Sequence, residues 1–526
     1  MRDNSRTLNS IRNGTVAFAM QICTIILGFW KRKAFLEYLG AELMGLNTTA
    51  ASLLEFLNLA ELGIVSAIAF TLYKPLYDAR QICEGDHIDK SDSPIQKVRE
   101  IIALQGWMYK WVACAIMAGS LVLSFFFPLI FAKSELPIGY AYITFGVLLY
   151  GSMLSYFVNY KAILLSADQK NYKIQLCTQS ISIIFSIITI IAVTCMQNPY
   201  IWWAGLQVLS ATVSAVALSY LVNNEYPYIK EKVAEKGKLR KKYPDVVSKV
   251  KQLFVHKIGG FIFTQFNPIV IYAFASLSSV TLYSNYNILA SSVGHMLFII
   301  FNSMKASIGN LVADSDKEHE LKVFRELFSL RFFCVGVICI CLWLLSDCFI
   351  QVWLGSEYLL DKTTLALIVL SFFLLRNRNT VDSFLDAHGA FYDVWVPYVE
   401  GGIYVGASIL LGSIYGLNGV LSGCIISQLT LTYTWKPYLL FRRTLDVSVR
   451  QYYVMLLKHI VMFAISLALC CGVADWLLIL RPESGFGHFF IYAALVGVSA
   501  AGILGMLLAV SEKGFRALIH RILTIR

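Results

Sequence analysis

The stretch that decides the fold runs from Thr364 to Leu385 and reads TLALIVLSFFLLRNRNTVDSFL. Its first dozen residues are almost all apolar, as a helix that crosses the hydrocarbon core of a membrane requires. Arg376 and Arg378 follow, and at about 1.5 Å of rise per residue they lie near the bilayer midplane. An arginine at that depth costs about 3 kcal/mol on insertion scales. The two arginines must therefore face water, a charged partner or a ligand.

Helical spacing gives the two arginines different neighbours, because residues two apart lie on nearly opposite faces of a helix. Arg378 shares its face with Asp382 and Asp386, which favours an ion pair with Asp382. Arg376 has no acidic residue on its own face, so it is the better candidate for a ligand contact, with a carboxylate on another helix as the alternative. The side chains that share the face of Arg376 are polar and uncharged: Asn379, Thr380 and Ser383.

The composition predicts an all-α polytopic membrane protein. The chain has 526 residues, of which 57% are hydrophobic and 15% are charged, whereas soluble domains carry about 25% charged residues. The net charge is +11, but the basic residues are clustered, and we expect no nucleic-acid binding. The 12 cysteines show no metal-ligand spacing, and no nucleophile elbow, P-loop or HExxH motif occurs. The sequence therefore predicts no catalytic residue, no metal and no cofactor.

Apolar runs long enough to cross a membrane occur about fourteen times. The first run has no small-residue cleavage site behind it and ends in Lys31-Arg32-Lys33, which predicts a retained first span followed by a helix-linking segment. The runs lie at about 12–30, 46–73, 107–132, 139–166, 175–196, 201–222, 257–279, 282–312, 328–354, 364–386, 396–415, 417–439, 453–478 and 486–510.

The distribution of lysine and arginine predicts that both termini are cytoplasmic. With the N-terminus inside, almost all basic clusters fall on inner segments, and most outer loops carry one basic residue or none. Lys31-Arg32-Lys33 is the exception.

The inner segment from Asn223 to Lys257 is strongly basic, which is typical of a solvated helix near anionic lipid, with a phosphate or partner site as the alternative. The C-terminal tail alternates basic and apolar residues and predicts an interfacial helix.

An internal repeat divides the chain. Ala167–Tyr172 follows the fourth run and Ala387–Tyr392 follows the tenth, at an offset of 220 residues, so that Tyr156 occupies the place of Arg376 in the first copy. Two parallel copies of six helices are typical of transporters with the site between the halves. The predicted parts are an N-terminal six-helix lobe at 1–222, a basic cytoplasmic linker at 223–256, a C-terminal six-helix lobe at 257–440, and two further helices with the basic tail at 441–526.

The N-terminal region also carries a family resemblance. The segments RKAFLEYLGAELMGL from Arg32, LAELGI from Leu59 and LYKPL from Leu72 resemble the polysaccharide-repeat-unit flippases of the multidrug/oligosaccharidyl-lipid/polysaccharide exporter superfamily, in particular the O-antigen and capsule exporters. This resemblance implies two six-helix lobes around a cavity, with an additional helix pair. It also implies a non-enzymatic protein of the bacterial inner membrane that moves an undecaprenyl-diphosphate-linked oligosaccharide to the periplasmic leaflet by alternating access.

The implied diphosphate identifies the candidate substrate-binding residues. Arginine suits a diphosphate because its guanidinium binds two oxygens at once and stays charged. Arg376 is the main candidate, with Arg378. Lys305, Arg32 and Lys33 are candidates for contacts at the two ends of the path, or they are snorkelling residues. The candidates for sugar contacts are Tyr156, Gln265, Asn267 and Asn287.

Acidic residues and a proline complete the predicted site. Glu55, Glu61 and Asp382 are candidates for a coupling cation or for ion pairs. For Glu61, which lies in the family-like ELG motif, we favour pairing or a structural role. Many relatives carry an acid in the seventh span, which here reads Thr264-Gln-Phe-Asn-Pro268, so cation coupling through that helix is in doubt. Pro268 removes a backbone hydrogen bond and would bend the span, as a gate or as a static kink.

The expected partners are the lipid-linked oligosaccharide and membrane lipid, with polysaccharide polymerase and assembly proteins as further candidates, and we expect a monomer. The alternatives are a lipid II-type peptidoglycan precursor flippase and a cation-coupled multidrug antiporter of the same fold. Such antiporters commonly need an acid in the first span, and Arg12–Trp30 has none. A polysaccharide polymerase or ligase would need a sizeable outer loop, which the predicted topology lacks.

Overall fold

The computed structural model describes residues 2–61, 63–83, 93–230, 239–302, 304–314, 316–389, 395–477 and 485–524. It does so without the side chains of residues 2–18, 21, 60, 80–83, 93, 230, 251–265, 306, 313–314 and 522–524. Every regular element in the described ranges is a helix, which confirms the predicted all-α class. Seven of the described helices combine the length and the hydropathy that a membrane crossing requires. Each of the fourteen expected runs coincides with a helix or with consecutive helices separated by a short break.

Two compact units make up the chain. The first contains Met1–Ile269 and Ser276–Ser278, and the second contains Val270–Ala275 and Ser279–Arg526. The chain passes from one unit to the other inside a single helix, α10, directly after Pro268 and Ile269. The four-part division expected from the sequence remains a prediction.

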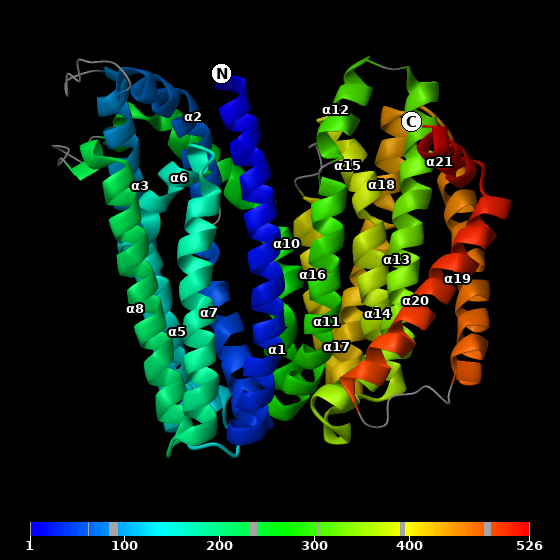
Figure 1. The fold of residues 1–526 in the computed structure, drawn as a ribbon, viewed down its shortest axis with the longest axis horizontal. Helices are drawn as coiled ribbons and strands as arrows, with labels where there is room; N and C mark the ends of the chain where they lie inside the picture. Colours follow the sequence, from blue (N-terminus) through cyan, green and yellow to red (C-terminus); the bar gives the residue numbers. More distant parts are fainter. Residues whose placement is uncertain are drawn as a thin grey trace. The chain divides into compact units, whose positions relative to one another are not determined.

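The first unit is a bundle of long helices (Figure 1). Its first helix continues through Lys31-Arg32-Lys33 and is interrupted at Gly40, where φ is 85° and ψ is 165°, a conformation that favours glycine. The expected linking segment after Trp30 is therefore helical up to Gly40. The elements are α1 (Arg2–Leu57), α2 (Ile64–Cys83), α3 (Ser93–Phe125), α4 (Phe127–Ile130), α5 (Ile138–Phe157), α6 (Ile163–Ala167), α7 (Asn171–Cys195), α8 (Pro199–Glu225), α9 (Leu239–Lys242) and most of α10 (Pro244–Phe274).

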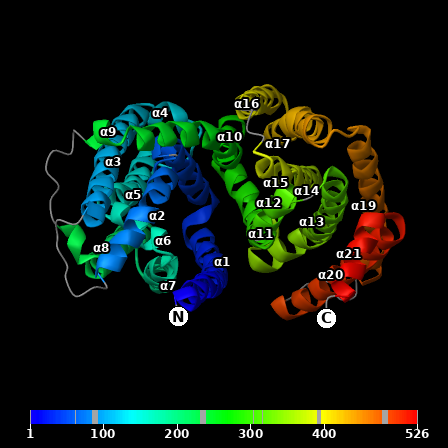
Figure 2. The same ribbon diagram turned by 90° about the horizontal axis from the view of Figure 1, so that it is seen from above.

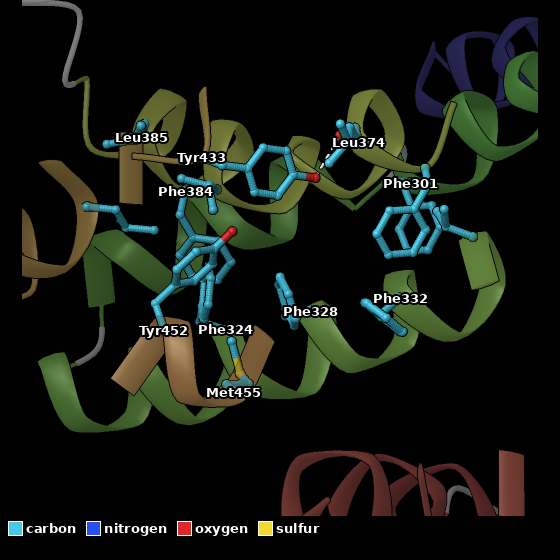
Figure 3. Close-up of a cluster of buried hydrophobic side chains, with 14 of the residues drawn as sticks. Phe301, Phe324, Phe328, Phe332, Leu374, Phe384, Leu385, Tyr433, Tyr452 and Met455 are labelled. Carbon is cyan, nitrogen blue, oxygen red and sulfur yellow. Dashed lines mark hydrogen bonds between the residues drawn. The ribbon is translucent and has the colours of Figure 1, made fainter. Parts of the chain in front are cut away.

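The second unit packs around an aromatic core. Phe324 and Phe328 project from α13 (Lys317–Trp353) toward Phe384 and Tyr452 (Figure 3). Phe332, one turn further along α13, packs on Phe373. The ring centroids of Phe324 and Phe384 are 5.1 Å apart. The other elements of this unit are α11 (Leu277–Asn302), α12 (Lys305–Asp314), α14 (Lys362–Asn377), α15 (Asn379–Ala387), α16 (Val396–Tyr415), α17 (Leu417–Ser427), α18 (Trp435–Tyr438), α19 (Arg450–Trp476), α20 (Phe486–Ser511) and α21 (Lys513–Thr524).

The last two long helices pack on α13 (Figure 2). Cys470 of α19 and Ala500 of α20 are buried against Ile340. Leu504 and Phe515 pack near Phe333, so the short basic helix α21 is held to the same unit. The helix pair expected after the second lobe is thus an integral part of the second unit.

Helix ends in the two units repeat at the offset found in the sequence. In the first unit α5 ends at Phe157, a 3₁₀ turn follows, and α6 ends at Ala167. In the second unit α14 ends at Asn377 and α15 ends at Ala387, each 220 residues later. Two copies of one broken helix therefore carry Tyr156 and Arg376 directly before the break.

Candidate functional site

Arg376 stands in the last turn of α14 and is partly buried. Its Nε is buried without a hydrogen-bond partner, and its Cζ lies 5.5 Å from the centroid of the Phe372 ring. Among the ion pairs of the described residues none involves Arg376. The Nε–H of this guanidinium is therefore a hydrogen-bond donor without a partner.

A glycine on α11 makes room for this guanidinium. A Cβ atom placed on Gly294 would lie 2.7 Å from Cζ and 2.7 Å from Nε of Arg376. Carbon atoms in contact are normally about 3.5–4.0 Å apart. The conformation of Arg376 thus depends on the missing side chain at Gly294.

Arg378 lies in the break between α14 and α15 and is held by two carboxylates. Its Nε is 3.4 Å from Oδ2 of Asp382, as the helical spacing predicts, and its Nη1 is 3.0 Å from Oε1 of Glu400 on α16. Nη1 also donates to Oγ1 of Thr432 at 3.3 Å. Oδ1 of Asp382 pairs with Nζ of Lys436 at 2.5 Å.

Two positive and two negative charges balance in this network, and Glu400 is only 5% exposed. A buried pair of this kind loses most when one partner is removed, because the other charge is left unpaired. The surroundings of Arg378 are therefore those of a structural ion pair, whereas Arg376 forms no ion pair among the described residues.

A polar cluster in the first unit surrounds Glu61. Tyr109 on α3 donates to Oε1 of Glu61 at 2.8 Å, and Tyr156 on α5 donates to Oε2 at 3.0 Å. Tyr156 also donates to Oδ1 of Asn58 at 3.0 Å. Glu55, which is exposed, is near enough for its charge to interact with that of Glu61.

This cluster holds a carboxylate with neutral donors. Phenol hydroxyls orient an ionised carboxylate without cancelling its charge. No ion pair of Glu61 occurs among the described residues, and the donors that hold its carboxylate are two phenol hydroxyls.

The remaining predicted residues are dispersed. Lys305 begins α12, after the end of α11, and its Nζ is 3.3 Å from Oδ2 of Asp386, with both side chains about half exposed. Arg32 and Lys33 lie inside α1, before Gly40, and are partly buried. Asn287 is exposed on α11.

The predicted residues of α10 belong to the first unit. Asn267 is 9% exposed, and α10 is helical through Pro268. Gln265 lies in the same helix, but its side chain is outside the described part of the structure.

The interruption at Arg378 is slight, because Arg378 keeps right-handed helical dihedral angles and donates its backbone N–H to the carbonyl of Leu374. Thr380 and Ser383, which the sequence placed on the face of Arg376, follow it on α15. They line a small cavity together with Arg331 of α13. No local spacing signal in the sequence points to a contact of Arg331 with α15. Glu400 was recognisable in the sequence as an acid inside the apolar run 396–415.

Two solved structures have a similar fold. The lipid II flippase MurJ, in an inward closed conformation, matches with a TM-score of 0.57 and 14% sequence identity, over 97% of this chain and 100% of that one. An inward-facing multidrug resistance MATE family transporter of the MOP superfamily matches with a TM-score of 0.54 and 11% identity, over 83% of this chain and 99% of that one. No model of a protein family and no curated protein sequence matches the chain.

Proposed function

We propose that this protein is a flippase of the MOP superfamily that moves an undecaprenyl-diphosphate-linked oligosaccharide from the cytoplasmic to the periplasmic leaflet of the bacterial inner membrane. The observation that carries the proposal is the contrast between two neighbouring arginines. Arg378 is neutralised by Asp382 and Glu400, whereas Arg376 has a buried Nε without a hydrogen-bond partner and forms no ion pair among the described residues. The fold shared with two transporters supports a transport function.

The substrate chemistry fits a guanidinium of this kind. A diphosphate offers several anionic oxygens, and arginine binds two of them at once. Lys305, Arg32 and Lys33 would contact the diphosphate outside the central position. Gln265, Asn267 and Asn287 would contact sugar hydroxyls, whereas Tyr156 is buried and belongs to the cluster around Glu61.

The driving force has two candidate sources. Each negative charge that moves outward gains about 2.3 kcal/mol per 100 mV of inside-negative potential, so a diphosphate with roughly two charges gains about twice that. Glu61, held by Tyr109 and Tyr156 beside Glu55, would bind a coupling cation or proton. We assign Asp382 to the ion-pair network of Arg378.

Two alternatives of the same fold remain distinguishable. A lipid II flippase would also use Arg376 on a diphosphate, so the two flippases differ in the sugar that accumulates. A multidrug antiporter would gain nothing from an arginine near the midplane, because a cationic drug is repelled by it.

The test is complementation of a deletion strain. We expect the deletion to accumulate a lipid-linked polysaccharide repeat unit, identified by mass spectrometry, and the wild-type gene to remove it. Arg376→Ala should fail to restore export, since the loss of one charge-assisted contact of about 1.5–3 kcal/mol weakens binding about 10- to 150-fold.

The control is Lys322→Ala, which removes an exposed charge from α13 and should restore export at equal protein level. Accumulated lipid II in the deletion strain would establish the first alternative instead. Full export with Arg376→Ala, or a change in drug efflux without a change in export, would refute the proposal.

A further inference from the structure

The first half of α13 buries four polar side chains, and three of them have a partner on another element. Glu320 bonds to His388, Oε2 of Glu326 is 3.1 Å from Nη2 of Arg521, and Oγ of Ser329 is 3.0 Å from Nε2 of His459. The fourth is Arg331, which is 7% exposed and whose Nη1 is buried without a hydrogen-bond partner. One guanidinium in this row therefore lacks the partner that its neighbours have.

The nearest carboxylate is already in use. Asp382 is close enough to interact electrostatically with Arg331 but forms no ion pair with it. Oδ1 of Asp382 is bound by Lys436 and Oδ2 by Arg378. Cζ of Arg331 lies 4.3 Å from the centroid of the Phe301 ring.

The charges around Arg331 do not balance. Arg331, Arg378 and Lys436 carry three positive charges, and Asp382 and Glu400 carry two negative ones. An uncompensated charge inside a protein is unfavourable by several kcal/mol, because it loses its hydration. A bound anion would remove this excess.

A cavity adjoins the guanidinium and limits the size of that anion. Its volume is about 10 Å³, which is room for about one water molecule. Thr380 contributes Oγ1, a second buried group without a partner and a potential donor. The hydroxyl of Ser383 already donates to the carbonyl of Asn379 at 2.7 Å. The other lining side chains are apolar: Phe301, Met304, Ile308 and Leu327.

We propose that this cavity binds one halide ion, chloride under cellular conditions, between Nη1 of Arg331 and the hydroxyl of Thr380. A monatomic anion needs little more room than one water molecule and few donors, whereas a phosphate or a carboxylate needs more of both. The site goes beyond the transport function and does not depend on it. The bound ion would neutralise Arg331 and link α13 to α15, the helix that follows Arg378.

The test is thermal unfolding of the purified full-length protein in sodium chloride and in sodium gluconate at equal ionic strength. We expect the unfolding temperature to rise saturably by a few degrees with chloride and with bromide, but not with gluconate, since a ligand that binds only the folded state stabilises it. Thr380→Val, which keeps the side-chain shape, and Arg331→Met should both lose this chloride-specific rise.

Lys322→Ala is the matched control, because it removes an exposed charge from the same helix, and it should keep the full rise. Equal unfolding temperatures of the wild type in the two salts would overturn the proposal and leave the cavity to a water molecule. An undiminished chloride-specific rise in Thr380→Val would overturn it as well. The threonine variant keeps the test decisive if Arg331→Met does not fold.

Discussion

Arg376 and Arg378 are two residues apart, and their different surroundings follow from what other helices offer them. Arg378 meets Glu400 of α16 and Thr432, which lie 22 and 54 residues further along the chain. Arg376 meets the backbone of α11 at Gly294 and the ring of Phe372. The same side chain therefore serves as an anchor at one position and as a candidate ligand group at the other.

At the residue scale we predict that Gly294→Ala impairs transport and leaves folding nearly intact. The new Cβ would lie 2.7 Å from Cζ of Arg376, so the guanidinium must move. The displaced group is the end of a long side chain, so a rotamer change relieves the clash at a cost of about 1 kcal/mol. Export of the lipid-linked sugar should fall about tenfold, while the thermal unfolding temperature should change by only a few degrees.

Gly402→Ala provides the matched control, because a Cβ there meets no atom within 4 Å. It should leave both export and unfolding temperature unchanged. If Gly294→Ala exported normally, the position of Arg376 would not matter for transport.

At the scale of elements, the interruption between α14 and α15 is stabilised by the network around Arg378. The charges tie this break to α16 and to the helical segment that follows α17. The aromatic core of α13 supports the same region, since Phe384 of α15 packs on Phe324. A broken helix with a fixed break can hold Arg376 in place.

We predict that Arg378→Met destabilises the protein by about 3–5 kcal/mol, because Glu400 is left buried and unpaired. The double variant, Arg378→Met with Glu400→Leu, should lose at least about 1 kcal/mol less stability than the sum of the two single losses, because residues in contact are energetically coupled. Denaturant or thermal unfolding of the wild type, the two single variants and the double variant measures the four free energies of unfolding that this comparison needs.

The pair of Lys305 and Asp386 serves as the comparison, because it also involves α15 but is about half exposed. Removing it should cost less than about 1 kcal/mol. If the stability lost by the double variant equalled the sum of the losses of the two single variants, Arg378 and Glu400 would not stabilise each other.

At the scale of the whole molecule, the internal repeat relates the two compact units. The breaks after Phe157 and Asn377 occur at the same place in the two copies, and each copy places a polar side chain one residue before its break. The first copy presents the phenol of Tyr156 to Glu61, whereas the second presents the guanidinium of Arg376. We infer that the two copies have different roles: the first unit would hold the coupling site, and the second unit would contact the anion.

The predicted topology has both termini in the cytoplasm, and reporter fusions test it. Alkaline phosphatase fused after Asn198 should be active, because this position follows α7 on the expected outer side. The same enzyme fused after Gln169, before α7, should be inactive, and green fluorescent protein at Arg526 should fluoresce. Active phosphatase at Gln169 would reverse the orientation of the first unit.

The sequence by itself determined the all-α class, the places of the long helices, the offset of 220 residues and the spacing that joins Arg378 to Asp382. These features depend on hydropathy and on helical periodicity, which are properties of a few consecutive turns. Only the tertiary structure decided that Glu400 completes the pairing of Arg378, that Tyr109 and Tyr156 hold Glu61, and that Arg331 adjoins a cavity without a carboxylate of its own. Such partners come from helices distant in the chain, and side-chain packing rather than local spacing brings them together.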